Sequence, residues 1–249
     1  MIILKSQQEI EYMKKAGELL ANVHKELARL IKPGVTTMEL DEFVEDYLRK
    51  HNAFPEQRGY HGYPYATCAS VNDEICHGFP RKAALNDGDI LTVDMVVNLD
   101  GWLADSAWSY GVGNISNDAK MLLDTTKDAL YIGIEQAVIG NRLGDIGHAI
   151  QSFVESKGYS VVRDFVGHGI GKNMHEDPQV PHYGVPGRGI RLLEGMVITI
   201  EPMINVGGYE MVMDDNGWTA RTADGKLSAQ YEHTLAITKD GPLILTTQD

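Results

Sequence analysis

An internal repeat constrains the fold of this chain more than any other feature of its sequence. At an offset of 106 or 107 positions, residues 33–48 match residues 139–154, and both stretches carry apolar residues at helical spacing. Farther along, residues 87–94 match residues 194–201, where both stretches are apolar runs that end in an acid. Because separate matches share nearly one offset, we interpret the chain as two variants of one α-α-β unit.

The repeat predicts a single domain over residues 1–249, with pseudo-symmetric halves of about 5–112 and 113–240. The first half should open with two helices, because capping-box sequences begin at Ser6 and at Thr36. In the second half, the apolar periodicity predicts helices over about 117–139 and 145–157.

Two β-like runs, residues 90–99 and 102–110, flank Asp100-Gly101, which is typical of a two-residue hairpin turn. Helices followed by hairpins predict an α+β fold in which helices cover antiparallel sheet.

Composition and charge argue against several classes of protein. The chain has 22 basic and 35 acidic side chains and a net charge of −13, the wrong sign for binding DNA through its phosphates. No apolar run is long enough to span a bilayer, and the N-terminus has no secretory signal pattern. Cys68 and Cys76 form neither a disulfide framework nor a CxxC pair. We therefore expect a cytoplasmic protein without DNA or membrane partners, whose acidity is compatible with bound metal.

Two acids at equivalent positions of the repeat, Asp94 and Glu201, lie in or at the end of apolar runs, where an uncompensated carboxylate is costly. The hairpin register would pair Asp94 with Ala107, which places Asp105 on a diagonal at about 7–8 Å. Two carboxylates that close repel each other unless a proton or a metal lies between them. The alternative is that Asp105 is an ordinary hairpin acid facing solvent.

Further candidates come from the second half and from the glycine-rich loops. Glu232 precedes an apolar strand-like run, and His168 is flanked by glycines that allow close backbone approach. The glycine spacing there does not fit a dinucleotide loop, and no regular parallel βαβ series follows. His77 and His175 lie in glycine-rich stretches that should border the same cleft; the alternative for each is an ordinary hydrogen-bonded loop histidine.

The chain resembles the pita-bread methionine aminopeptidases in the residue types and order of five candidate metal ligands, Asp94, Asp105, His168, Glu201 and Glu232. The resemblance covers nearly the whole chain and includes the stretches Tyr60-His61-Gly62-Tyr63-Pro64, Cys76-His77-Gly78, Gly167-His168-Gly169-Ile170-Gly171, Glu201-Pro202-Met203 and Gln230-Tyr231-Glu232-His233-Thr234. Only 33 positions separate His168 from Glu201, which leaves no room for the insertion of the type 2 enzymes. The first predicted helix begins near residue 6, so the chain is similar to the minimal, bacterial-style type 1 form.

The resemblance implies two divalent metal ions bridged by Asp105 and Glu232. Asp94 would bind one ion, and His168 and Glu201 would complete the other. Four carboxylates and one imidazole suit manganese, iron(II) or cobalt, and zinc remains an alternative.

The resemblance also implies catalytic roles. Glu201 would transfer a proton, His175 would hydrogen-bond the oxygen of the tetrahedral intermediate, and His77 would position the scissile amide and assist the leaving amine. His77 and His175 would border a methionine pocket whose other walls are Tyr60, Tyr63, Cys68, Met174 and Trp218. Met174 and Gln57 depart from the residues common in relatives, which puts the shape of the pocket in question.

We therefore expect a monomeric hydrolase that removes the initiator methionine from peptides and nascent chains, at the ribosome, when the second residue is small. One alternative is a Xaa-Pro aminopeptidase or dipeptidase of the same fold. The other is a non-catalytic peptide- or ribosome-binding protein that has lost its metals.

Overall fold

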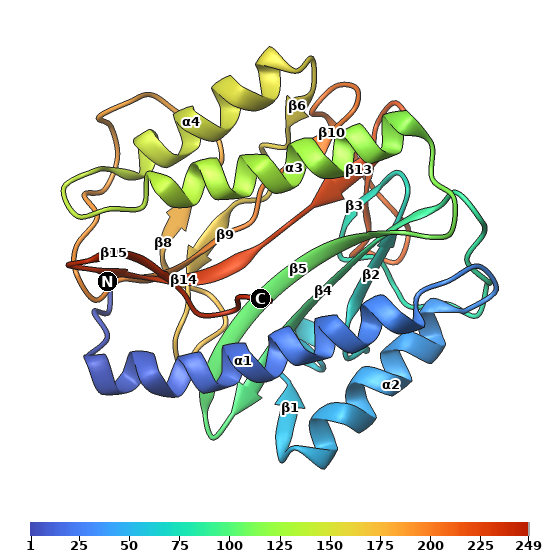
Figure 1. Ribbon diagram of the computed structural model, residues 1–249, viewed down its shortest axis with the longest axis horizontal. Coiled ribbons are helices and arrows are strands. Elements are labelled where there is room, and N and C mark those ends of the chain that lie inside the picture. The colour runs from blue at the N-terminus through green and yellow to red at the C-terminus, as the bar shows by residue number, and fades with distance from the viewer. Residues whose placement is uncertain (249) are drawn as a thin grey trace.

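The structure is a computed structural model that describes residues 1–248. Two pairs of helices lie over antiparallel strands, the first pair blue and the second green to yellow in Figure 1. The first pair is α1 (Gln7–Leu30) and α2 (Thr37–Lys50), and the second is α3 (Asn117–Glu135) and α4 (Leu143–Ser156). In the described part of the chain, no helix is long and apolar enough to cross a membrane.

The helix starts follow the capping chemistry. Ser6 and Thr36 each accept a hydrogen bond from the third helical residue, whose glutamate side chain accepts in return from the cap backbone. The expected helix over 117–139 was too long, because Gln136 donates to Gly133 in a tighter turn and Gly140 then takes a φ of 97°. The last helix begins at Leu143, two residues before the expected start, since Asp145 caps the backbone of Arg142.

The predicted hairpin forms in the expected register. It comprises β4 (Ile90–Leu99) and β5 (Trp102–Gly111), with Leu99 opposite Trp102 and Asp94 opposite Ala107. Two further strands, β1 (Ala53–Pro55) and β2 (Cys68–Val71), pair with β4 and complete a four-stranded sheet. A short 3-10 helix, η1 (Tyr60–Gly62), lies between them in the chain.

The remaining strands form three sheets, all with antiparallel pairing. The five-stranded sheet has the order β15-β14-β9-β7-β8, and the smaller sheets have the orders β13-β10-β6 and β11-β12-β3. Their bounds are β3 Glu74–Cys76, β6 Ser160–Val161, β7 Gly167–Gly169, β8 Glu176–Val180, β9 Val197–Ile200, β10 Met203–Asn205, β11 Met211–Met213, β12 Ala220–Thr222, β13 Ser228–Gln230, β14 His233–Thr238 and β15 Gly241–Ile244.

Equivalent elements recur at the spacing of the sequence repeat. The 14-residue helices α2 and α4 begin at residues 37 and 143, which are 106 positions apart. Ahead of each helix, the chain forms an isolated β-bridge, Thr36 with Ala84 and Arg142 with Arg191, at offsets of 106 and 107. The chain therefore enters both helices from the same kind of backbone contact.

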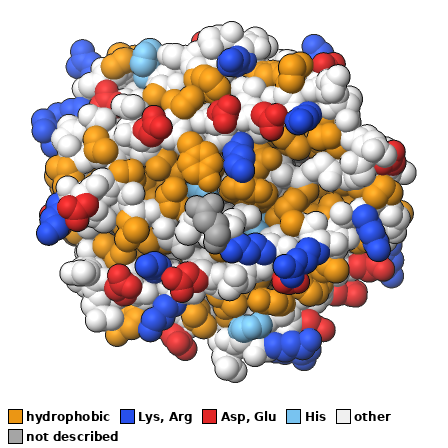
Figure 2. All heavy atoms as spheres, viewed as in Figure 1, with side chains coloured by type: hydrophobic (Ala, Val, Ile, Leu, Met, Phe, Trp, Pro, Cys, Tyr) orange, Lys and Arg blue, Asp and Glu red, His pale blue; other side chains and the backbone are white. Residues whose placement is uncertain are grey.

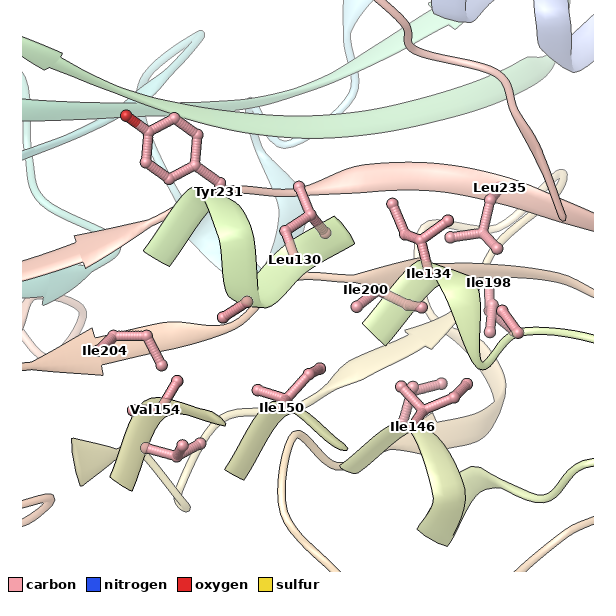
Figure 3. Packing of buried hydrophobic residues seen from close by; sticks show 14 of the residues in the cluster. Leu130, Ile134, Ile146, Ile150, Val154, Ile198, Ile200, Ile204, Tyr231 and Leu235 are labelled. Carbon is pink, nitrogen blue, oxygen red and sulfur yellow. The ribbon is translucent and has the colours of Figure 1, made fainter. Parts of the chain in front are cut away.

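Each helix pair buries its own apolar core against strands. Side chains of α3 and α4 point toward β9 and its neighbours (Figure 3), with Ile134, Ile150 and Ile200 among the buried residues. A second core packs Leu20 of α1 and Val44 of α2 against the first hairpin. On the face drawn in Figure 2, acidic and basic side chains are interspersed, so the net charge of −13 does not gather there in one patch.

The two cores meet where β5 lies along the end of β13 and the start of β14. The backbone amide of Glu232 donates to the Ala107 carbonyl at 2.9 Å. The Thr234 hydroxyl bonds to the backbone of Asp105, accepting from its amide at 3.0 Å and donating to its carbonyl at 2.8 Å. Acids from both halves are therefore held at this seam.

Candidate metal centre and adjoining pocket

The five predicted ligand side chains come together at the seam. The His168 Nε2 atom lies 3.5 Å from Asp105 Oδ2 and 3.6 Å from Glu201 Oε1. Asp105, His168 and Glu232 each offer one potential ligand atom, and these three atoms lie within 4.8 Å of one another. The Asp94 carboxyl interacts directly with that of Asp105, so the set is continuous.

The hairpin register places the first two acids. Asp105 is 5% exposed, which excludes the alternative that it is a hairpin acid facing solvent. Asp94 is only half-buried, but the surface it retains lines a cavity rather than the outside of the molecule.

Glu201 and Glu232 both lie in breaks between strands. Glu201 lies between β9 and β10, and Glu232 between β13 and β14, where the chain passes from one sheet to another. Because Glu201 lies outside the paired strands, its backbone amide is free to donate to His182 Nε2, at 3.0 Å. These breaks let both carboxylates turn toward the seam.

Burial and mutual repulsion disfavour charge on the acids. The pKa of Asp105 is raised to about 7, chiefly by burial. The pKa values of Asp94, Glu201 and Glu232 are raised well above their usual range by burial and then by their acidic neighbours. Burial also lowers the pKa of His168, which favours the neutral imidazole that can bind a metal.

The donor set fits a divalent cation. Asp105 Oδ1 and Glu232 Oε1 are buried without a hydrogen-bond partner, although buried polar atoms are rarely left unpaired. Among the described residues that line the adjoining cavity, none is Lys or Arg, so no side-chain cation offsets the acids. A metal would supply that charge and reverse the pKa shifts, and oxygen ligands with one imidazole suit a hard or borderline ion.

Several residues that support the ligands were not singled out from the sequence. The Thr199 hydroxyl donates to Glu201 Oε1 at 2.8 Å and accepts from the His168 amide at 3.0 Å. Gln230 Nε2 donates to Glu201 Oε2 at 3.4 Å. Thr199 could have been found, because it lies two positions before Glu201 and so on the same face of the strand. His182 gave no signal that separates it from a packing histidine.

A cavity of about 170 Å³ adjoins the ligand cluster. All seven predicted pocket residues line it, namely Tyr60, Tyr63, Cys68, His77, Met174, His175 and Trp218. The Tyr63 and Trp218 rings meet edge to face, with centroids 5.1 Å apart. Phe165 and Met203 also line the cavity and add to its apolar wall.

Gln57 and Met174 shape this cavity from different sides. The Gln57 amide oxygen accepts from the Val96 amide at 2.8 Å, and its Nε2 donates to the Asp94 carbonyl at 3.4 Å. Gln57 therefore secures the strand that carries Asp94. Met174 is buried and presents a flexible thioether to the cavity.

The two predicted loop histidines border the same cavity. His77 has a φ of 56°, an uncommon conformation for a non-glycine residue, and is followed by Gly78, where a Cβ would lie 2.4 Å from the Ala69 carbonyl oxygen. Its imidazole meets Phe165 edge to face, and burial lowers its pKa to about 4.

His175 is exposed as a residue, but its ring lies against the site. Its centroid is 4.4 Å from that of His168, and its Nδ1 is hydrogen-bonded to the Tyr60 hydroxyl at 2.8 Å. Desolvation by these neighbours, with the nearby His168 and His61, lowers the pKa of His175 to about 4. Both loop histidines are therefore neutral near pH 7.

Comparison with known proteins gives a consistent result. The model of metallopeptidase family M24 matches residues 11–239. The methionine aminopeptidase of Clostridium perfringens is 51% identical over 246 residues, which cover 99% of both chains. The crystal structure of methionine aminopeptidase from Rickettsia prowazekii has a TM-score of 0.98 at 43% identity, covering 99% of this chain and all of that one.

A prolidase from Pyrococcus horikoshii shares the fold alone. Its TM-score is 0.80 at 23% identity, and the match covers all of this chain and 65% of the prolidase.

Proposed function

Because this chain belongs to metallopeptidase family M24 and to its bacterial-type methionine aminopeptidases, with the pita-bread fold, we propose that its five clustered ligands hold two divalent ions. The protein is a hydrolase that removes N-terminal methionine. The observation that carries the proposal is that the acids of both halves meet His168 beside one apolar, aromatic cavity. In this assignment the ions would be held by Asp105 and Glu232 together with Asp94 on one side and His168 and Glu201 on the other.

When bound, such ions supply Lewis-acid activation of the reacting groups. The protein's own contribution begins at Glu201. Its two carboxylate oxygens accept hydrogen bonds from Thr199 and Gln230, which hold the group in one orientation. From that position Glu201 takes a proton from the attacking water and returns it to the leaving amine.

His175 and His77 act as neutral hydrogen-bonding groups. In our proposal the Tyr60 hydroxyl donates to Nδ1 of His175, which leaves the proton on Nε2 to be donated to the oxygen that gains charge. His77 lines the same cavity, where it positions the scissile amide and assists the leaving amine.

The cavity selects the side chain of the first residue. Tyr63, Met174 and Trp218 provide an apolar, polarisable surface that suits a thioether. A cavity of about 170 Å³ takes one side chain, so we propose that the second residue must be small to lie against its rim.

The substrates we propose are peptides and nascent chains that begin with methionine, in the cytoplasm and at the ribosome, with the enzyme acting as a monomer. Manganese, iron(II), cobalt and zinc are all compatible with the ligand set.

The experiment that tests the proposal is metal analysis coupled to hydrolysis of a methionyl peptide. Chelation should abolish cleavage of Met-Ala-Ser, and adding back a divalent metal should restore it together with two bound ions per chain. Full activity of the metal-free protein would refute the two-metal assignment. A Xaa-Pro dipeptide should remain uncleaved, and cleavage of that peptide alone would favour the Pro-directed alternative.

A further inference from the structure

A buried ion pair lies beside the turn that carries Met174 and His175. It joins Lys5, in the segment before α1, to Glu176, at the start of β8. The two side chains are only 4% and 5% exposed. A lysine is almost never this buried unless it is paired, and removing one partner of such a pair leaves an uncompensated charge.

Glu176 connects this lysine to the turn that precedes β8. Glu176 Oε1 accepts a hydrogen bond from the Asn173 amide at 3.3 Å. Within the same turn, the Gly171 amide donates to the Asn173 carbonyl at 3.2 Å. The lysine charge, the glutamate and the turn backbone therefore form one connected unit.

Close packing fixes where the lysine can lie. A Cβ added at Gly171 would be 2.6 Å from Lys5 Cε and 2.7 Å from Glu176 Oε1, so the aliphatic chain of Lys5 lies directly against this glycine. The lysine backbone is fixed as well, because its amide donates to the Gly195 carbonyl at 2.7 Å. Lys5 Nζ also donates to the Ile3 carbonyl at 3.1 Å.

The turn that this unit holds carries two pocket residues. Met174 forms part of the cavity wall, and His175 contacts Tyr60 and His168 on the cavity side. His175 directly precedes Glu176 in the chain, so a shift of the glutamate backbone is passed to the histidine. Lys5 itself is not among the residues that line the cavity.

We infer that Lys5, acting through Glu176, is a positioning residue that holds His175 at the distance from the substrate that the reaction needs. This inference rests on the role proposed above for His175. Lys5 does not line the cavity, and its ion-pair partner is Glu176 rather than a proposed metal ligand. Its removal should therefore change the placement of His175 without emptying the metal site.

A double-mutant cycle on kcat tests the inference, with Lys5→Met, His175→Ala and the combined variant in the metal-loaded enzyme. Misplacing a group by about 1 Å can cost about 10²-fold, so Lys5→Met should lower kcat roughly 10- to 100-fold with metal content unchanged. In the His175→Ala background, Lys5→Met should cause no further loss of kcat, because the residue it positions is already absent.

Two further variants separate positioning from loss of stability. Val154→Ala truncates a buried side chain in the core of α3 and α4, so it should lower the free energy of unfolding while leaving kcat unchanged. The pair Lys5→Met with Glu176→Met removes both charges, so it keeps the test open if Lys5→Met alone fails to fold. That pair should fold and still show the reduced kcat.

Three outcomes would overturn the inference: a kcat for Lys5→Met within twofold of the wild type, losses that multiply in the combined variant, or a normal kcat for the double-methionine variant. An unchanged kcat for His175→Ala would instead refute the role proposed for His175. The two failures are therefore distinguishable.

Discussion

At the scale of single residues, Asp105 shows how much the chemistry of an acid depends on what stands beside it. Without a cation, burial raises its pKa to about 7, and Oδ1 has no partner. With a metal on each side, the same carboxylate would be charged and would hold both ions.

Asp105→Asn keeps the shape of the side chain and removes its charge. We expect activity on a methionyl peptide to fall at least about 10³-fold, equal to about 4 kcal/mol of transition-state stabilisation, and metal content to fall with it. Steady-state kinetics and metal analysis measure the two effects. Asp46→Asn, at an exposed acid of α2, is the control and should change neither. Near-normal turnover of Asp105→Asn would contradict the bridging role.

His24 makes the stability of the fold depend on pH, although it does not itself line the cavity. It is fully buried on α1, with Nδ1 hydrogen-bonded to Tyr110 and Nε2 to the Ser106 carbonyl, and burial lowers its pKa from 6.5 to about 4. The unfolded chain therefore takes up a proton first as the pH falls. The contribution of His24 is complete above about pH 6.5 and is lost progressively down to about pH 4.

Between about pH 6.5 and pH 4 the free energy of unfolding should fall by about 3 kcal/mol, which follows from the difference between the two pKa values of His24. Denaturant unfolding at several pH values measures it, with His24→Gln as the comparison so that shared contributions cancel. Parallel pH profiles for the two proteins would show that His24 contributes nothing.

The ligands differ in how far the sequence reveals them. Asp94 and Glu201 are conspicuous because they interrupt or end apolar strands, and the turn chemistry at Asp100-Gly101 fixes where Asp105 must lie. His182 could not be recognised in this way. Its role arises only because the chain leaves β9 at Glu201 and needs an acceptor for the freed amide.

At the scale of elements, the starts of helices were easier to predict than their ends. The capping boxes at Ser6 and Thr36 are local motifs, so they can be recognised in the sequence. The end of α3 is set instead by tertiary packing, because Ala137 is fully buried in a turn although its sequence continues the helical pattern. Periodicity alone cannot identify such a position.

The contact between α1 and the C-terminal segment has no room for another methyl group. A Cβ at Gly17 would lie 2.0 Å from the backbone oxygen of Leu245, which cannot rotate away. Gly17→Ala should therefore lower the free energy of unfolding by about 1–3 kcal/mol, despite the higher helix propensity of alanine.

Denaturant titration measures this effect. Asn22→Ala, at an exposed position of the same helix, should stay within about 0.5 kcal/mol of the wild type. Stabilisation by Gly17→Ala would mean that propensity outweighs the clash.

At the scale of the whole molecule, the organisation into one domain of two halves is a prediction that unfolding can test. The proposed metal ligands come from both halves, and the hydrogen bonds of the Glu232 amide and the Thr234 hydroxyl cross the seam. We therefore expect both halves to unfold in one cooperative transition.

Two tryptophans can report on this transition, Trp102 within the first half and Trp218 where the second half packs on Tyr63. One variant keeps only Trp102 and another keeps only Trp218, with phenylalanine at the other tryptophan positions. Their fluorescence transitions in urea should coincide, and chelation should move both to lower urea by mass action. An earlier transition at Trp218 would mean that the second half unfolds independently.

The order of the ligands along the chain also limits when the enzyme can become active during its own synthesis. A ribosome that has released only the first half has exposed Asp94 and Asp105, two acids that repel each other without their partners. His168 and Glu201 emerge later, and Glu232 is the last of the five. Lys5 is made before Glu176 and must likewise wait for its partner. A newly made molecule therefore cannot process other nascent chains until the segment that carries Glu232 has left the ribosome.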